Sequence, residues 1–309
     1  MITTVTVNTA IDKTYIVENF GLNGVFRVQR VMAQAGGKGL NVARVVKALG
    51  EEVVATGFIG GYNGMFIKEC LVAEGLNGDF VTIGGESRIC LNVLDPAGRS
   101  QTELLEPGPE ITAQEAEKLK EKVRSLARLS QVVTLSGSLA RGLPPDYYAQ
   151  IIKIVHREGA KVILDSSGEA LKEGLKAGPY MVKPNLQEAE SLAGKRLADE
   201  EARKEFLRGL LGAGVKVAVL SLGEAGALFG TVGGFFRVVP PGVQTVNTVG
   251  CGDAFVAGFA VGLARGQGIK QAVRLGTAAA AASAASWKAG ECRREQIPEL
   301  ELNVQVFEV

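Results

Sequence analysis

Asn247-Thr248-Val249-Gly250-Cys251-Gly252-Asp253 lies where an extended segment meets an apolar helix that we expect over Ala254–Ala264. Glycines before a helix let backbone N–H groups converge, and the helix start adds unpaired donors and a partial positive charge. A phosphoryl group can be held at such a junction, with Asp253 beside it as a base. The alternative interpretation of Asp253 is an ordinary helix-start acid, which would stabilise the helix by ~0.3–1 kcal/mol.

The composition favours a protein that acts on a small molecule. The chain has 309 residues, and 46% of them are hydrophobic, which suffices for one large α/β domain or two smaller ones. Its net charge is +1 and no segment is dominated by Lys or Arg. The electrostatic footprint of a nucleic-acid or membrane-surface binder is therefore missing, and we expect neither kind of partner.

Cysteine usage and the N-terminus favour a cytoplasmic protein. The four cysteines lie far apart and form no CxxC pair, which argues against a disulfide framework or a structural zinc site. The stretch Met1–Val5 lacks the basic and apolar regions of a signal peptide. The Ala-rich segment Thr277–Ala285 is too short to span a bilayer, so we expect a tightly packed interior helix there.

Short apolar runs alternate with amphipathic segments along most of the chain. We expect strands at Val5–Val7, Val53–Ile59, Val132–Leu135, Val162–Leu164, Tyr180–Val182 and Val217–Leu220, and helices at Leu40–Leu49, Met65–Ala73, Tyr147–His156 and Glu201–Leu211. Fully apolar strands separated by helices predict a mostly parallel sheet covered on both faces. Ligands are then expected at the carboxyl ends of the strands.

Two segments do not follow this alternation of strands and helices: Lys13–Ala33 and Arg88–Leu105. Both alternate apolar and polar residues without a helix, so we expect them to pair as one small antiparallel sheet that forms a lid over the active edge. The alternative is a β-excursion that serves dimerisation, and one sheet could do both. The predicted division is a core of residues 1–12, 34–86 and 106–309 and a discontinuous lid of residues 13–33 and 87–105.

A second glycine cluster, Ala35–Ala43, opens the first expected helix. It puts Lys38 and Asn41 on one exposed face, where a sugar or phosphate could dock, although a structural turn is the alternative. It is not a Walker A loop, because Gly39 stands where Ser or Thr would hold a metal. The stretch Asn8–Asp12 replaces the glycine-rich turn of a dinucleotide-dependent oxidoreductase, which disfavours that class.

Six stretches together resemble the PfkB (ribokinase-like) carbohydrate kinase family, and the resemblance covers essentially the whole chain. They are Asn8–Asp12, Gly36–Ala43, Ser136–Leu139, Lys183–Glu188, Ser221–Gly226 and Asn247–Gly258. The resemblance implies a three-layer ribokinase-like α/β fold, with a mostly parallel central sheet flanked by helices and a small β-sheet lid.

Within that family, Gly85–Arg88 and Thr102–Gly108 resemble the hexose-phosphate branch of 1-phosphofructokinase and tagatose-6-phosphate kinase. This implies ATP-dependent phosphorylation of a ketohexose phosphate, with fructose 1-phosphate giving fructose 1,6-bisphosphate as the first expectation. Tagatose 6-phosphate is the close alternative, and a non-catalytic sugar-phosphate sensor is the remote one. Asp165–Leu171 and Gly174–Ala177 look more like the 1-phosphofructokinase group, but they are not an obvious part of the sugar site.

The resemblance also implies roles for individual residues. Asp253 is the expected general base, beside an anion hole formed by the N–H groups of Gly250, Cys251 and Gly252. The expected sugar-phosphate residues are Asp12, Arg27, Gly37, Lys38, Gly39, Asn41, Arg88 and Ser136. The expected ATP-binding residues are Lys183, Asn185, Ser221, Gly223, Glu224 and Gly226. Glu188 is expected to hold Mg²⁺ through water, since magnesium rarely needs more than one or two protein carboxylates; a helix-start acid is the alternative.

Three further residues carry separate expectations. Cys251 stands where relatives usually have Ala or Ser, and a thiol at a helix start can have a lowered pKa, which predicts sensitivity to oxidation; a small space-filling residue is the alternative. His156, the only histidine, is expected at the surface, so a multi-histidine metal site is excluded. Exposed apolar residues in the lid, such as Val25, Phe26 and Val28, are compatible with a homodimer formed through the lid.

Overall fold

The central sheet of the computed structural model, which describes residues 1–309, has eleven strands. Ten follow the order β15-β14-β13-β12-β11-β10-β9-β1-β4-β5, and β6 pairs with β4. The strands are β1 (Ile2–Thr6), β4 (Val53–Gly60), β5 (Asn77–Gly78), β6 (Val81–Ile83), β9 (Val132–Ser136), β10 (Lys161–Asp165), β11 (Met181–Val182), β12 (Val217–Ser221), β13 (Ala227–Thr231), β14 (Gly234–Val239) and β15 (Gln305–Glu308). Pairing is parallel from β5 to β12 and antiparallel from β12 to β15.

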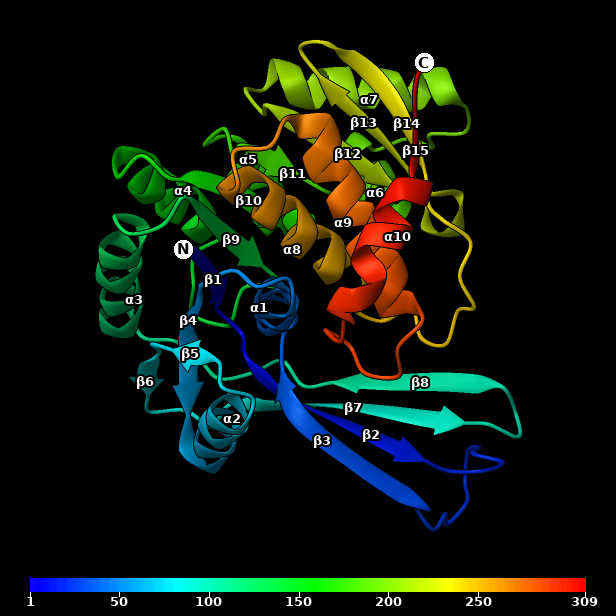
Figure 1. The fold of residues 1–309 in the computed structure, drawn as a ribbon. Helices are drawn as coiled ribbons and strands as arrows, with labels where there is room; N and C mark the ends of the chain where they lie inside the picture. Colours follow the sequence, from blue (N-terminus) through cyan, green and yellow to red (C-terminus); the bar gives the residue numbers. More distant parts are fainter.

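Helices cover both faces of this sheet (Figure 1). One hydrophobic cluster joins the sheet to α1 (Lys38–Ala48), α2 (Gly61–Ala73), α8 (Cys251–Ala264), α9 (Ile269–Ala284) and α10 (Ile297–Asn303). The other involves α3 (Ala113–Ala127), α4 (Tyr147–Arg157), α5 (Gly168–Leu175), α6 (Leu186–Ala193) and α7 (Glu200–Gly212). Every residue of β1 and β9 is buried, because side chains on both faces meet helices. The predicted three-layer architecture is confirmed.

Most of the Ala-rich segment is buried in α9, as predicted. This helix packs against α8 at glycine positions: a Cβ on Gly258 would lie 2.7 Å from the Cα of Gly276. Small residues on both helices let the backbones approach closely, which buries the first turns of α8 firmly in the core. No helix has the length and apolar character needed to cross a membrane. His156 is exposed near the end of α4, as expected.

A separate four-stranded sheet projects from the core (Figure 1). Its order is β3-β2-β7-β8, with β2 (Ala10–Ile16), β3 (Arg30–Gly36), β7 (Arg88–Asp95) and β8 (Ser100–Leu105). The prediction of an all-antiparallel sheet is wrong, because β2 and β7 pair in parallel. An alternating pattern identifies strands but not their direction, and a connection through α1, β4 and α2 lets β7 return parallel to β2.

The small sheet also extends closer to the core than the predicted lid segments. β2 starts at Ala10 and β3 ends at Gly36, so Asp12 lies within a strand of this sheet. Gly36 makes the close pairing feasible, since a Cβ there would lie 2.2 Å from the Cγ of Asp12. The carboxylate of Asp12 is thereby held where the two sheets meet.

Candidate active site

A cavity of about 1120 Å³ lies between the small sheet and the carboxyl ends of the central strands. Its walls come from the starts of α1 and α8, from the ends of β10, β11 and β12, and from the small sheet. The cavity therefore lies at the edge of the parallel sheet where ligands were expected.

The start of α8 presents backbone donors to this cavity. Gly250 adopts a left-handed conformation with φ of 85°, which only glycine takes without strain, and it forms the N-cap. The N–H groups of Gly250, Gly252 and Asp253 make no hydrogen bond, whereas Cys251 N–H donates to the carbonyl of Thr248 at 3.3 Å. The free donors therefore include Asp253 in place of the predicted Cys251. The N–H group of Cys251 is already used by the turn that precedes the helix.

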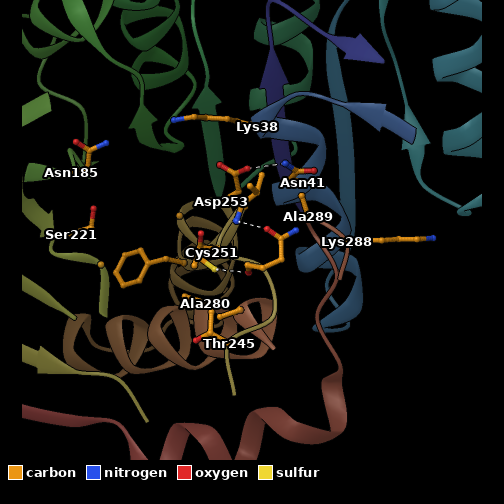
Figure 2. A pocket seen from close by; sticks show the side chains of 18 of the residues that line it. Lys38, Asn41, Asn185, Ser221, Thr245, Cys251, Asp253, Ala280, Lys288 and Ala289 are labelled. Atoms are coloured by element: carbon orange, nitrogen blue, oxygen red, sulfur yellow. Dashed lines mark hydrogen bonds between the residues drawn. The ribbon is translucent and has the colours of Figure 1, made fainter. Parts of the chain in front are cut away.

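Asp253 is buried beside these donors and faces Asn41 of α1 (Figure 2). Asn41 Nδ2 donates to Asp253 Oδ2 at 2.9 Å, and Arg44 Nη1 donates to Asn41 Oδ1 at 3.1 Å, which fixes the orientation of the amide. Burial, and then the neighbouring carboxylate of Asp165, raise the pKa of Asp253 to about 7. Lys38, Asn41 and Lys183 oppose this shift. A carboxyl group with such a pKa is suited to accepting a proton near neutral pH.

Two lysines and a second carboxylate lie next to Asp253. Lys38 Nζ lies 3.6 Å from Asp165 Oδ2, and Lys183 Nζ lies 3.4 Å from Asp165 Oδ1. Asp165 attracts the Lys38 ammonium and raises its pKa. A Cβ on Gly252 would lie 3.1 Å from Lys183 Nζ, so Lys183 also adjoins the backbone donors of α8. Cations from two elements thus converge on the start of α8.

Sequence reasoning did not identify Asp165 as a site residue. It is the last residue of β10, directly after a buried apolar run, and it lines the cavity with only 2% of its surface exposed. A signal was present, because an acid that ends a parallel strand lies at the ligand-binding edge. Arg44 was also missed, and its role is indirect, through Asn41.

The small sheet supplies Asp12 and Arg88 to the opposite wall. Burial raises the pKa of Asp12, and the charges of Arg44 and Arg88 counteract part of that rise. Arg88 Nη1 donates to the carbonyl of Glu106 at 3.0 Å, while its buried Nε has no partner. Cys90, which pairs with Asp12 across the two strands, lines the cavity too. This wall offers a hydrogen-bond acceptor and an unsatisfied cationic donor close together.

The expected ATP-binding residues line one side of the cavity. Figure 2 shows Asn185 and Ser221 across the cavity from Asn41 and Lys288, and Gly223, Glu224 and Gly226 line it as well. Gly226 has φ of 85°, and a Cβ there would lie 2.0 Å from the Val238 carbonyl, so only glycine fits. This forms a tight backbone turn after β12.

Asn185 and Glu188 form a capping box at the start of α6. Glu188 N–H donates to Asn185 Oδ1 at 2.8 Å, and Asn185 N–H donates to Glu188 Oε2 at 2.9 Å. The helix-start role of Glu188 is therefore real. Its second oxygen, Oε1, accepts no hydrogen bond, although the residue lines the cavity, so one carboxylate oxygen stays available.

Three predicted site residues do not line the cavity. Gly39 packs on β1, since a Cβ there would lie 2.3 Å from Thr6 Oγ1. Ser136 is buried at the end of β9 and its hydroxyl has no partner. Arg27 is exposed between β2 and β3. The remaining predicted residues, Gly37 and Lys38 included, all line it.

The predicted lowering of the Cys251 pKa is wrong. Burial, and then the charge of Asp253, raise the pKa of this thiol to about 11. The helix start cannot compensate, because the thiol is desolvated and lies near a carboxylate of the same helix. The alternative interpretation, a small residue that fills space, fits the structure better.

Comparisons with known proteins agree with this geometry. The model of the pfkB family of carbohydrate kinases matches residues 4–296. Phosphofructokinase-2 from Escherichia coli, solved with potassium, is 28% identical with a TM-score of 0.92, over 97% of this chain and 98% of that chain. A Staphylococcus aureus protein provisionally described as a phosphofructokinase is 31% identical with a TM-score of 0.85, over 100% and 99%. A Thermotoga maritima protein provisionally described as a 1-phosphofructokinase is 25% identical with a TM-score of 0.90, over 100% and 99%.

These matches extend over the whole arrangement of sheet, helices and small second sheet described above. They confirm the family predicted from the six stretches and the expected ribokinase-like fold. Since the family model covers nearly all of the sequence, the chain belongs to the pfkB family of carbohydrate kinases and is a phosphotransferase with an alcohol group as acceptor.

Proposed function

We propose that the chain transfers a phosphoryl group from ATP to a ketohexose phosphate, with fructose 1-phosphate as the preferred acceptor and fructose 1,6-bisphosphate as the product. The observation that carries this proposal is the buried Asp253 beside three free N–H groups, in a cavity that also contains Lys38 and Arg88. The base and the donors suit phosphoryl transfer, and the two cations suit an acceptor that already carries a phosphate.

Asp253 takes the proton of the attacking hydroxyl in this proposal. The Asn41 amide holds the carboxylate in place, and burial keeps its proton affinity high enough to accept a proton near pH 7. The N–H groups of Gly250, Gly252 and Asp253, which have no hydrogen-bond partner, would stabilise the negative charge that moves during transfer. Such donors are fixed before the reaction, so they need no reorganisation during it.

The sugar phosphate would lie between the small sheet and α1. The Asp12 carboxylate accepts hydrogen bonds from sugar hydroxyls, and Arg88, whose Nε is unsatisfied, offers a planar donor fork to the phosphate. Lys38 adds a second positive charge from the first turn of α1. Gly37, with φ of 114°, allows that turn to start against Thr6.

The nucleotide would lie along Lys183, Asn185, Ser221 and the Gly223–Gly226 turn. Glu188 fits a role in holding Mg²⁺ through water, because its Oε1 is free and magnesium prefers carboxylate oxygen and water. Bound Mg²⁺ would neutralise phosphate charge. No further protein carboxylate is required for that role.

The phosphorylated fructose derivatives are the acceptors to compare first. Escherichia coli phosphofructokinase-2 has been solved in complex with fructose 6-phosphate, and the Thermotoga protein is provisionally described as a 1-phosphofructokinase. A coupled assay of ADP release should compare fructose 1-phosphate, fructose 6-phosphate, tagatose 6-phosphate and free fructose. The highest kcat/KM for fructose 1-phosphate supports the proposal. Preference for tagatose 6-phosphate assigns the sister activity, and preference for free fructose contradicts the phosphate-binding role of Lys38 and Arg88.

We also propose a homodimer formed through the small sheet. Leu22, Val25, Val31 and Leu104 are exposed on that sheet and its connecting loop, with Val25 exposed at 99%. Packing this surface against a second copy of the chain would remove apolar area from water. Light scattering should give twice the chain mass for the parent and the chain mass for Val25→Asp; a monomeric parent contradicts the proposal.

All four cysteines are free thiols, which fits the expected cytoplasmic location.

A further inference from the structure

We propose that Asp165 is a positioning residue for phosphoryl transfer that holds Lys38 and Lys183 beside the catalytic base. As a neighbouring carboxylate, it also disfavours ionisation of that base. The inference rests on the proposed function, since it assigns Asp253 as the base. It adds a residue from β10 that touches neither the expected sugar-binding side chains of the small sheet nor the nucleotide turn after β12.

The geometry supports this role first. Lys38 begins α1 and Lys183 follows β11, so the two lysines come from elements that do not pair, and Asp165 is the anion that they share. The Nζ to carboxylate distances of 3.6 Å and 3.4 Å are long for hydrogen bonds. The lysines are thus held by charge while their N–H groups stay able to turn toward an incoming phosphate.

The surroundings of Asp165 also support a positioning role. It is almost completely buried, and neither carboxylate oxygen accepts a hydrogen bond. A buried carboxylate is costly unless it is paired, and here the two ammonium groups are the only compensation. A merely structural acid would be expected to accept hydrogen bonds from the backbone around it, as Asp95 does from Asn19, Phe20 and Gly98.

Few charged groups therefore surround Asp253. From α1 it faces Lys38 and the Asn41 amide, and from the segment after β11 it faces Lys183. From β10 it faces Asp165, and on its own helix it neighbours the Cys251 thiol. Glu188 of α6 acts on Lys38. Asp165 is the one carboxylate that directly opposes ionisation of Asp253, so removing its charge must favour the ionised base.

The test is the pH profile of kcat/KM for the parent, Asp165→Asn and Asp165→Glu. We expect the acidic limb of Asp165→Asn to move to lower pH by about one unit, because Asp253 loses the like-charged neighbour that disfavours its ionisation. Its kcat at pH 8 should fall at least ~10-fold, because both lysines lose their anchor. Asp165→Glu keeps the negative charge, so the acidic limb of its kcat/KM profile should lie at the same pH as that of the parent. Asp79→Asn, which removes an exposed carboxylate paired with Lys122 outside the cavity, should change neither quantity.

A rate loss in Asp165→Asn with an unmoved limb would show a structural role only and overturn the proposal, as would an equal shift of the limb in Asp165→Glu. A second measurement needs no substrate and no turnover. Asp253→Asn should change the pH dependence of urea unfolding less in the Asp165→Asn background than in the parent, and an equal change would contradict the proposal. If the parent phosphorylates no sugar phosphate, the proposed function fails, while the unfolding test still decides whether Asp165 disfavours ionisation of Asp253.

Discussion

Replacing Asp253 by Asn should stabilise the protein at alkaline pH, because the native structure resists ionising this carboxyl. Burial and Asp165 raise its pKa from 3.8 to about 7. Between these two values the unfolded chain loses the proton while the folded protein keeps it, so rising pH favours unfolding. Above pH 7 Asp253 is ionised in both states, so the loss of folding stability is complete. Below pH 3.8 it is protonated in both states, so no stability is lost.

The size of the effect follows from the shift. Three pKa units correspond to a ceiling of about 4 kcal/mol of lost stability, of which ~2–3 kcal/mol accrues between pH 5 and pH 8. Asp253→Asn removes the titrating group and lets the amide oxygen still accept from Asn41. The stability of the variant relative to the parent should therefore rise by ~2–3 kcal/mol from pH 5 to pH 8.

Urea unfolding followed by far-ultraviolet circular dichroism at both pH values measures this difference. Comparing the two pH values cancels any pH-independent effect of the substitution. Asp79→Asn serves as the control, since that carboxylate is exposed and lies outside the cavity. An identical stability difference between variant and parent at pH 5 and pH 8 would contradict the raised pKa of Asp253, because Asp253 would then be no more protonated in the folded state than in the unfolded one.

Three further outcomes are expected. Gly226→Ala should destabilise the protein by at least ~1–3 kcal/mol, measured by the urea midpoint, because its φ is positive and the new Cβ would meet a backbone carbonyl; an unchanged midpoint would contradict the tight turn. Lys38→Met should raise the KM for the sugar phosphate ~10–100-fold and leave the KM for free fructose unaffected, as expected for a lost charge-assisted hydrogen bond. Cys251→Ala should retain activity, and the parent thiol should react slowly with iodoacetamide at pH 7.5, because burial raises its pKa to about 11; rapid loss of parent activity that the variant escapes would oppose this.

Much of the fold could be predicted from the sequence because its strands and helices have strong and regular patterns. In β10 and β12 the residues Val162–Leu164 and Val217–Leu220 are buried, so these strands contain unbroken apolar runs. The glycines before α1 and α8 mark helix starts by backbone chemistry alone. These local signals agree with one another, which is why the expected strands and helices occur in the predicted order. Helix α3 and the antiparallel strands β13, β14 and β15 were not predicted.

What the sequence could not reveal depends on contacts between distant segments. The parallel pairing of β2 with β7 is set by the path of the chain between them, and no local pattern encodes it. The importance of Asp165 arises from Lys38 and Lys183, which the fold brings to it from other elements. The raised pKa of Cys251 likewise reflects burial that a helix-start motif does not report. Gly39 looked like part of a binding loop, and its role is close packing on Thr6.

The role of Asp253 as general base can be measured as the rate of fructose 1,6-bisphosphate formation from ATP, Mg²⁺ and fructose 1-phosphate at pH 8, compared between the parent and Asp253→Asn. Both proteins should be shown to be folded by circular dichroism beforehand. We expect turnover by the parent and a ~10²–10⁴-fold lower kcat for the variant, the usual contribution of a general base. Turnover by the variant within a few-fold of the parent would contradict the assignment of Asp253, and therefore the proposed mechanism.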